Sequence, residues 1–372
     1  MPSRAKVLIA GGGVAGLETA LALQALAPEK VEVELLAPRQ DLLYRPLAVG
    51  EPFGTARVAR YDLTELANRG GFTFTLSSLK AVEADNKRAV THDGVELDYD
   101  FLVFVPGVKL FWSVPGATMF WGGPDELDSE VVVERLGEER IDTLVFVLTA
   151  GRTWSLPAYE LAMLTEASLS HKDAASRPQA LIVTPEDKPL AVFGQNVSEA
   201  VTGLLEERGI GLVTGAHPVK FEKDKLIVAP GDSISADAAI AFPAMQGRKI
   251  EGIPHDDDGF VRTDEVGRIL GVAQAYAAGD VTTFPVKQGG IASQQADVVA
   301  ESIAAEAGVD IQPKPFDPVL RGVLWTGRGK KYLYAEIGGG HGETSSISDE
   351  PVWTESEGKI VSRYLSPFLA ES

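Results

Sequence analysis

Residues 6–20, Lys-Val-Leu-Ile-Ala-Gly-Gly-Gly-Val-Ala-Gly-Leu-Glu-Thr-Ala, constrain the fold more than any other part of the chain. A short apolar run precedes glycines 11, 13 and 16, and an Ala/Leu-rich segment follows. This order predicts a strand that turns sharply into a helix whose first amides point at a phosphate. We expect Gly11 to permit the turn, Gly13 to let a pyrophosphate approach, and Gly16 to let helix and strand pack closely. A dinucleotide site is therefore favoured over a glycine-rich turn without a ligand.

Composition limits the kind of protein this is. A chain of 372 residues predicts about two domains, and 45% hydrophobic residues can fill their cores. The net charge of −19 argues against nucleic acid and against charge-driven binding to anionic lipid. We find no apolar run of transmembrane length and no signal peptide, so we expect a cytoplasmic protein.

Two residue types exclude further chemistry. Cysteine is absent, so disulfides, thiolate nucleophiles, iron–sulfur clusters and cysteinyl-flavin bonds are excluded. The five histidines, at positions 92, 171, 217, 255 and 341, have no ligand-like spacing. We therefore predict no metal site, and we expect His341 to lie on a surface loop.

Strands and helices alternate along the chain, which predicts the α/β class. Residues 31–37 form the expected second strand, but Ala37, Pro38 and Arg39 stand where an acid normally holds the ribose. Water, backbone or Arg39 remain open as ribose contacts. Residues 98–107 predict a buried strand ending in Pro106-Gly107, and residues 274–280 predict a strand ending in Gly279-Asp280. A helix from near residue 289 to about residue 305 follows.

Three motifs resemble the FAD-binding parts of the pyridine nucleotide–disulfide oxidoreductase superfamily, over roughly residues 5–310. They are the glycine loop at residues 11–16, the strand ending in Pro106-Gly107 and the strand ending in Gly279-Asp280. The resemblance implies two Rossmann-like domains of three layers, the second inserted in the first. It implies an FAD domain at 1–108 and 246–315, a second dinucleotide-type domain at 109–245, and a small C-terminal region at 316–372. It also implies non-covalent FAD, with cofactor-binding residues Gly11, Gly12, Gly13, Val14, Ala15, Gly16, Arg39, Arg45, Pro46, Val82, Pro106, Gly107, Gly279, Asp280, Lys287 and Gln288. The helix starting near residue 289 would aim its amides at the flavin's pyrimidine carbonyl.

Three short matches resemble the branch of sulfide:quinone oxidoreductase, flavocytochrome c sulfide dehydrogenase and type II NADH dehydrogenase. They are Leu-Tyr-Arg-Pro-Leu at 43–47, Pro-Ala-Tyr-Glu at 157–160 and Ala-Ser-Gln-Gln at 292–295. Sulfide enzymes carry a cysteine just upstream of Pro-Ala-Tyr-Glu, whereas this chain has Trp-Ser-Leu at 154–156. Cysteine-dependent sulfide oxidation is therefore excluded.

The second dinucleotide unit departs from the pattern at its glycine loop. Its strand is predicted at residues 142–148 and its helix at residues 159–164. Aligning Glu-Leu-Ala of that helix places Thr153, Ser155 and Ala158 at the three glycine positions. Side chains at the first two positions oppose the turn and fill the space of a pyrophosphate. Glu186, at the end of a later strand, could still meet a ribose, so NAD(P)H binding stays uncertain.

Glu160 and Lys287 are the candidate catalytic residues. In the related enzymes the glutamate at this place lies near the reactive edge of the flavin, where a buried carboxyl could relay a proton. The alternative is a solvated acid in the first turn of a helix. Lys287 is expected to offset negative charge on reduced flavin, with a surface lysine as the alternative.

The C-terminal region falls outside the resemblance. Residues 319–327, 332–337 and 351–353 suggest strands, with a mobile Gly/Ser-rich loop at 338–348. Residues 359–370 place Ile360, Val361, Tyr364, Leu365, Phe368 and Leu369 on one helical face. Packing on the chain's own flavin domain or a second subunit is favoured over docking on a membrane, and a homodimer stays open.

The sequence thus predicts an FAD-dependent oxidoreductase acting on a small redox substrate, with no nucleic acid partner. We expect a donor that is not bound by a standard NAD(P) loop and an acceptor such as a quinone or small redox carrier. Two alternatives stay open: an NAD(P)H:quinone-type dehydrogenase with a non-standard nicotinamide site, and a flavoprotein with mainly a scaffolding role.

Overall fold

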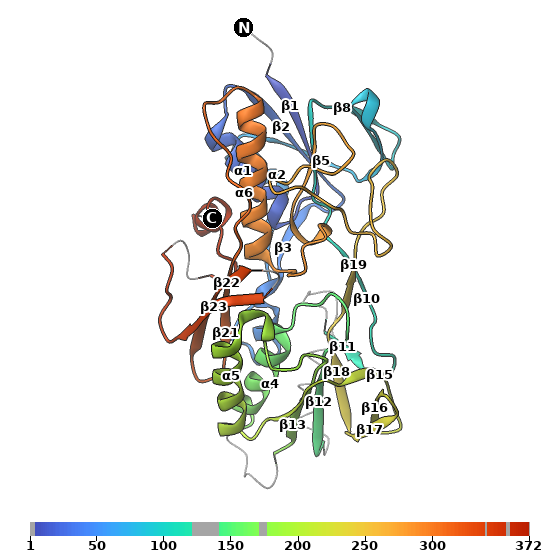
Figure 1. The fold of residues 1–372 in the computed structure, drawn as a ribbon, viewed down its shortest axis with the longest axis vertical. Coiled ribbons are helices and arrows are strands. Elements are labelled where there is room, and N and C mark those ends of the chain that lie inside the picture. Colours follow the sequence, from blue (N-terminus) through green and yellow to red (C-terminus); the bar gives the residue numbers. More distant parts are fainter. Residues whose placement is uncertain (1–3, 121–140, 171–176, 339–340, 355–357, 372) are drawn as a thin grey trace.

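The computed structural model describes residues 4–120, 141–170, 177–338, 341–354 and 358–371. Figure 1 shows two α/β units stacked along the long axis, with a smaller sheet beside them. Blue and orange elements meet in the first unit, because segments far apart in the chain both contribute to it. The predicted α/β class with parallel sheets is confirmed.

The first unit is built on a five-stranded parallel sheet in the order β20-β9-β1-β2-β5. Its strands are β1 (Ala5–Ala10), β2 (Val31–Ala37), β5 (Thr73–Leu76), β9 (Phe101–Phe104) and β20 (Ala275–Ala277). The interior strand β9, which lies between β20 and β1, is buried along its whole length, as expected for a parallel strand covered on both faces. Helices α1 (Val14–Leu26) and α6 (Gly289–Glu306) lie side by side against this sheet (Figure 1).

Smaller elements complete the first unit. Helix α2 (Leu63–Gly70) begins at Asp62, whose carboxylate accepts from two first-turn amides. The remaining pieces are the pair β3 (Asp41–Tyr44) and β4 (Ala59–Asp62), the 3₁₀ segment η1 (Arg45–Phe53), and the antiparallel strands β6 (Leu79–Glu83), β7 (Arg88–Thr91) and β8 (Glu96–Asp98).

The second unit repeats the design with a parallel sheet in the order β11-β18-β12-β13-β14. Its strands are β11 (Thr118–Met119), β12 (Thr143–Val147), β13 (Gln179–Val183), β14 (Gly211–Val213) and β18 (Ala238–Ala241), with helices α4 (Leu156–Ser168) and α5 (Gln195–Glu207). A side sheet contains β15 (His217–Glu222), β16 (Lys225–Ala229) and β17 (Asp232–Ser235). The antiparallel pair β10 (Lys109–Phe111) and β19 (Ala244–Gln246) carries the chain between the units.

A third, antiparallel sheet packs against α4 and α5 and consists of β21 (Val319–Trp325), β22 (Lys330–Gly338) and β23 (His341–Ser348). The prediction of a mobile loop at residues 338–348 is therefore wrong, because residues 341–348 pair with β22 as an edge strand. A Gly/Ser-rich edge strand lacks the apolar alternation that marks a buried one. The strand expected at residues 351–353 is also absent from this described segment.

The C-terminal helix is shorter than predicted. Only α7 (Leu365–Ala370) is helical, whereas the buried residues 359–361 are not. Pro367 explains the difference, since a proline fits the first turn of a helix but would break one that began at residue 359. In the described part of the chain, no helix has the length and apolar character needed to cross a membrane.

Candidate functional site

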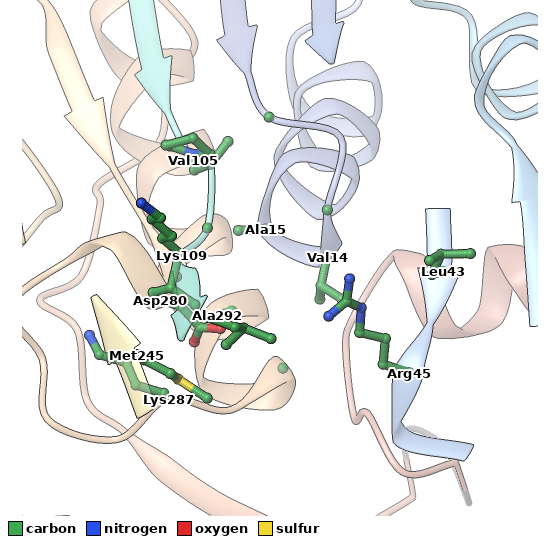
Figure 2. Close-up of a pocket in the computed structure, with 18 of the residues that line it drawn as sticks. Val14, Ala15, Leu43, Arg45, Val105, Lys109, Met245, Asp280, Lys287 and Ala292 are labelled. Carbon is green, nitrogen blue, oxygen red and sulfur yellow. The ribbon is translucent and has the colours of Figure 1, made fainter. Parts of the chain in front are cut away.

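A cavity of about 1030 Å³ lies where the two α/β units and the C-terminal segment meet. It begins at the glycine loop after β1 and reaches α4 and the residues that precede α7. Figure 2 shows Asp280, Lys287 and Met245 gathered on one side, with Arg45 across the cavity near Val14. The predicted site residues that line it are Gly11, Gly12, Gly13, Val14, Ala15, Arg39, Arg45, Pro46, Pro106, Gly107, Gly279, Asp280, Lys287, Gln288 and Glu160.

The glycine loop has the shape that a dinucleotide phosphate requires. A Cβ on Gly11 would lie 2.0 Å from the Val105 carbonyl oxygen, and one on Gly16 would lie 1.9 Å from the Gly11 carbonyl oxygen. These two glycines therefore let the turn and helix α1 approach the sheet. Gly13 differs, because no atom lies within 4 Å of its ideal Cβ position. Its open side faces the cavity at the start of α1, where the helix dipole favours an anion.

Two predicted cofactor residues do not line the cavity. Gly16 is packed beneath the loop, as described above. Val82 lies in the core around β1 and β9, and its backbone N–H donates to the carbonyl oxygen of Glu251. Arg39 and Arg45 both line the cavity with exposed side chains, so the wall near α1 carries positive charge.

Two oppositely charged side chains, Asp280 and Lys287, line the cavity wall near α6. Lys287 is only 2% exposed, which excludes the surface-lysine alternative. Its Nζ donates to the Thr282 carbonyl oxygen at 2.5 Å. Burial lowers the pKa of Lys287 to about 7, although the charge of Asp280 acts in the opposite direction. Burial likewise raises the pKa of Asp280.

Helix α6 begins with its amides at the cavity. Gln288 caps the helix, since its side-chain oxygen accepts from the Ile291 N–H at 2.9 Å. Gly289 and Ala292 of the first turn line the cavity. A Cβ on Gly279 would lie 3.2 Å from Ala15 and 3.3 Å from Ala292, so the two helix starts converge on this glycine.

Glu160 is buried within α4 at 1% exposure, which excludes the solvated-acid alternative. Its carboxylate pairs with the ammonium of Lys359 and accepts from the Trp325 backbone N–H at 2.8 Å. The Lys359 ammonium also lies 4.4 Å from the centre of the Trp325 ring. Burial raises the pKa of Glu160 and lowers the pKa of Lys359, while their mutual attraction opposes both shifts. This pair lines the cavity.

Lys359 belongs to a C-terminal strap, residues 359–370, that sequence reasoning did not assign to the site. Ile360 lines the cavity, and its backbone N–H donates to the Tyr44 hydroxyl at 3.0 Å. Further along, the buried Glu18 of α1 accepts from the backbone N–H groups of residues 363, 364 and 365. The available signal was a lysine directly before two apolar residues, Ile360 and Val361, in a segment otherwise expected to be amphipathic.

The second βα connection differs from the first. Glycines 11–13 alone join β1 to α1, whereas residues 148–155 separate β12 from α4. Pro157 occupies the first turn of α4 and cannot donate a backbone hydrogen bond. Thr153 and Trp154 line the cavity, and Ala158 is fully buried. The start of α4 therefore lacks the short glycine turn that seats a phosphate.

Glu186, the candidate ribose acid of the second unit, is engaged by its own unit. Its carboxylate accepts from the hydroxyls of Ser155 at 3.1 Å, Tyr159 at 2.7 Å and Thr184 at 3.1 Å. Burial raises its pKa, whereas these hydrogen bonds lower it. A ribose would have to replace these three donors.

The described residues contain no group of three or more His, Asp or Glu side chains placed to hold a metal ion. His92 lines the cavity, and His171 lies outside the described residues.

Known proteins share this architecture. The solved sulfide:quinone oxidoreductase of Aquifex aeolicus has a TM-score of 0.81 at 19% identity, covering 93% of this chain and 87% of that one. A ferredoxin reductase of Rhodopseudomonas palustris has a TM-score of 0.67 at 18% identity, covering 90% and 83%.

Sequence relatives point in the same direction. An NADH dehydrogenase-like protein of Mycobacterium tuberculosis is 23% identical over 296 residues, or 74% of this chain and 72% of that protein. A sulfide-quinone reductase of Aquifex aeolicus is 24% identical over 260 residues, or 66% of this chain and 59% of that protein. The model of the pyridine nucleotide-disulphide oxidoreductase family matches residues 5–298. The chain therefore belongs to this family and is an FAD-dependent oxidoreductase.

Proposed function

We propose that the protein holds FAD non-covalently in this cavity and takes electrons from a donor other than a nicotinamide nucleotide. Bound FAD supplies an acceptor for a hydride or an electron pair, which it then passes on. Gly13 and the start of α1 would receive the pyrophosphate, with Arg39 and Arg45 on the same wall. Asp280 would accept from the ribityl chain, and the first amides of α6 would face the pyrimidine carbonyl.

One observation carries the proposal about the donor: the connection at residues 148–155 lacks the short glycine turn, and Pro157 stands in the first turn of the helix that follows. The carboxylate of Glu186 is also used by Ser155, Tyr159 and Thr184. Both contacts that a Rossmann unit offers a nucleotide, the phosphate turn and the ribose acid, are thus changed in this unit.

The wall near α4 supports a quinone or a similar flat acceptor. Aromatic and aliphatic side chains line it, including Phe120, Trp154, Phe242 and Ile360. Quinone reduction consumes protons as well as electrons, and a buried carboxyl or ammonium of shifted pKa exchanges protons near neutral pH. We assign this exchange to the pair Glu160–Lys359. The names of the relatives, a sulfide-quinone reductase among them, favour the same acceptor class.

Anaerobic mixing tests the proposal about the donor. Purified yellow protein is mixed with NADH or NADPH while the visible flavin absorbance is followed. We expect the absorbance to persist, and we expect dithionite-reduced protein to be reoxidised by a water-soluble quinone. Rapid bleaching by either nucleotide would refute the proposal and favour an NAD(P)H:quinone dehydrogenase, the activity suggested by the NADH dehydrogenase-like relative. Failure to reoxidise with quinone, ferricyanide or oxygen would favour the scaffolding role.

The variant Glu160→Gln tests the proton exchange. It removes the titrating carboxyl while keeping an oxygen that can accept from the Trp325 N–H. Reoxidation by quinone should slow and lose its pH dependence. The control Glu199→Gln, an exposed acid on α5, should behave as the wild type.

A further inference from the structure

The loop that replaces the second phosphate turn carries an arginine that reaches into the first unit. The Arg152 guanidinium donates to the Thr283 carbonyl oxygen at 2.8 Å, and the Arg152 carbonyl oxygen accepts from the Met245 N–H at 2.9 Å. The same guanidinium lies 4.2 Å from the centre of the Phe260 ring. Arg152 thus fastens the second unit to the segment that precedes α6.

Lys287 contacts the same aromatic ring and the neighbouring backbone carbonyl from the cavity side. Its ammonium donates to Thr282, the neighbour of Thr283, and lies 4.5 Å from the centre of the same Phe260 ring. Two cations therefore share one aromatic ring and adjacent carbonyls. Lys287 lines the cavity, whereas Arg152 and Phe260 are not among the lining residues.

Asp256 holds this arrangement together. Its Oδ1 accepts from the Phe260 N–H at 2.8 Å, and its Oδ2 lies 3.9 Å from the Arg152 guanidinium. Arg152 is therefore held between the Phe260 ring and the Asp256 carboxylate, which itself accepts from the Phe260 N–H. The charged groups that act on Lys287 are Asp280, Arg152 and Asp256.

We propose that Arg152 is a positioning residue that controls whether Lys287 carries a charge, and so controls how many protons accompany reduction of the bound flavin. This inference rests on the FAD function proposed above. When the bound flavin takes up two electrons and one proton, the site gains one negative charge. Lys287, when it is neutral beforehand, balances that charge by taking a second proton from water.

The direction of the control follows from the charges. A neighbouring cation and burial both disfavour the ammonium, so both keep the pKa of Lys287 low, at about 7. Removing the charge of Arg152 also leaves Asp256 acting on Lys287 without its partner, which favours the ammonium further. The variant Arg152→Gln should therefore raise the pKa of Lys287 by about one pH unit.

Nuclear magnetic resonance of lysine labelled at its ε-carbon measures this pKa directly in the oxidised protein, with Lys287→Met identifying the signal. We expect titration near pH 7 in the wild type and about one pH unit higher in Arg152→Gln. Arg152→Lys keeps the charge and should titrate close to the wild type. Arg262→Gln removes an exposed arginine that follows Phe260 and should leave the titration unchanged.

Potentiometry gives the second readout. The slope of the flavin midpoint potential against pH should double above the pKa of Lys287, because one more proton then accompanies each electron pair. The break should move upward with the pKa in Arg152→Gln and should disappear in Lys287→Met. An unchanged Lys287 titration and break in Arg152→Gln, or an equal shift in Arg262→Gln, would overturn the proposal. Neither measurement depends on the physiological donor, so reduction by NADH would refute the proposed donor without affecting this result.

Discussion

Replacing Lys359 by methionine tests whether the strap and α4 depend on a buried ion pair. The side chains of Glu160 and Lys359 are 2% and 6% exposed. Removing one partner of a buried pair costs about 3–5 kcal/mol, because the remaining charge stays out of water. Lys359→Met keeps the aliphatic volume and, among the described residues, leaves Glu160 with the Trp325 N–H as its remaining hydrogen-bond partner. We therefore expect Lys359→Met to lower the free energy of unfolding by about 3–5 kcal/mol at pH 7.5.

The loss should depend on pH with a definite sign. Burial raises the pKa of Glu160 in the folded protein, and the charge of Lys359 opposes that rise. Without Lys359 the folded-state pKa rises further above the unfolded value of about 4.3. A carboxyl whose pKa is higher in the folded than in the unfolded protein contributes fully to stability below its unfolded-state pKa. That contribution is lost as the pH rises toward the folded-state pKa. The deficit of Lys359→Met should thus be smaller at pH 5 than at pH 7.5.

Urea unfolding of the flavin-loaded protein, followed by circular dichroism at fixed FAD concentration, measures this deficit. Lys331→Met is the matched control, because the side chains of Lys331 and Asp349 are 30% and 79% exposed. Such an exposed ion pair should contribute less than about 1 kcal/mol to the free energy of unfolding. The double variant Glu160→Gln, Lys359→Met should be more stable than Lys359→Met alone. A deficit no larger than that of Lys331→Met, or one equal at both pH values, would refute the reasoning.

Three other substitutions have expected outcomes. Gly13→Val should fold with a native circular dichroism spectrum but bind FAD roughly tenfold more weakly or worse, since its side chain enters open cavity space and displaces charge-assisted phosphate contacts. Gly11→Ala should instead fail to give folded protein, because its Cβ would meet the Val105 carbonyl oxygen; a well-folded Gly11→Ala would contradict this. Glu18→Gln places an amide donor against backbone N–H groups, so limited proteolysis should cut the strap faster than in the wild type or in Glu301→Gln.

Much of the first unit follows from local sequence. Glycines 11 and 16 are required by close backbone contacts, and such contacts leave a spacing that can be recognised in the chain. Glu160 and Lys287 were chosen from their place beside motifs, and the structure shows both buried at the cavity. Their roles in binding and catalysis stay proposals.

The missed features depend on contacts between distant segments. Lys359 meets Glu160 across 199 positions of the chain, and Arg152 meets Thr283 across 131. No periodicity or motif reports such pairs, because each partner alone resembles an ordinary charged residue. The edge strand β23 was missed for a related reason, since its pairing with β22 and not its own composition makes it a strand.

We propose that the first α/β unit of this chain retains a working nucleotide loop and that the second does not. Native mass spectrometry with saturating FAD and NADH counts the dinucleotides bound to each chain most directly. We predict one FAD and no nicotinamide nucleotide per chain. Binding of one FAD together with one NADH, or no FAD at all, would contradict this proposal.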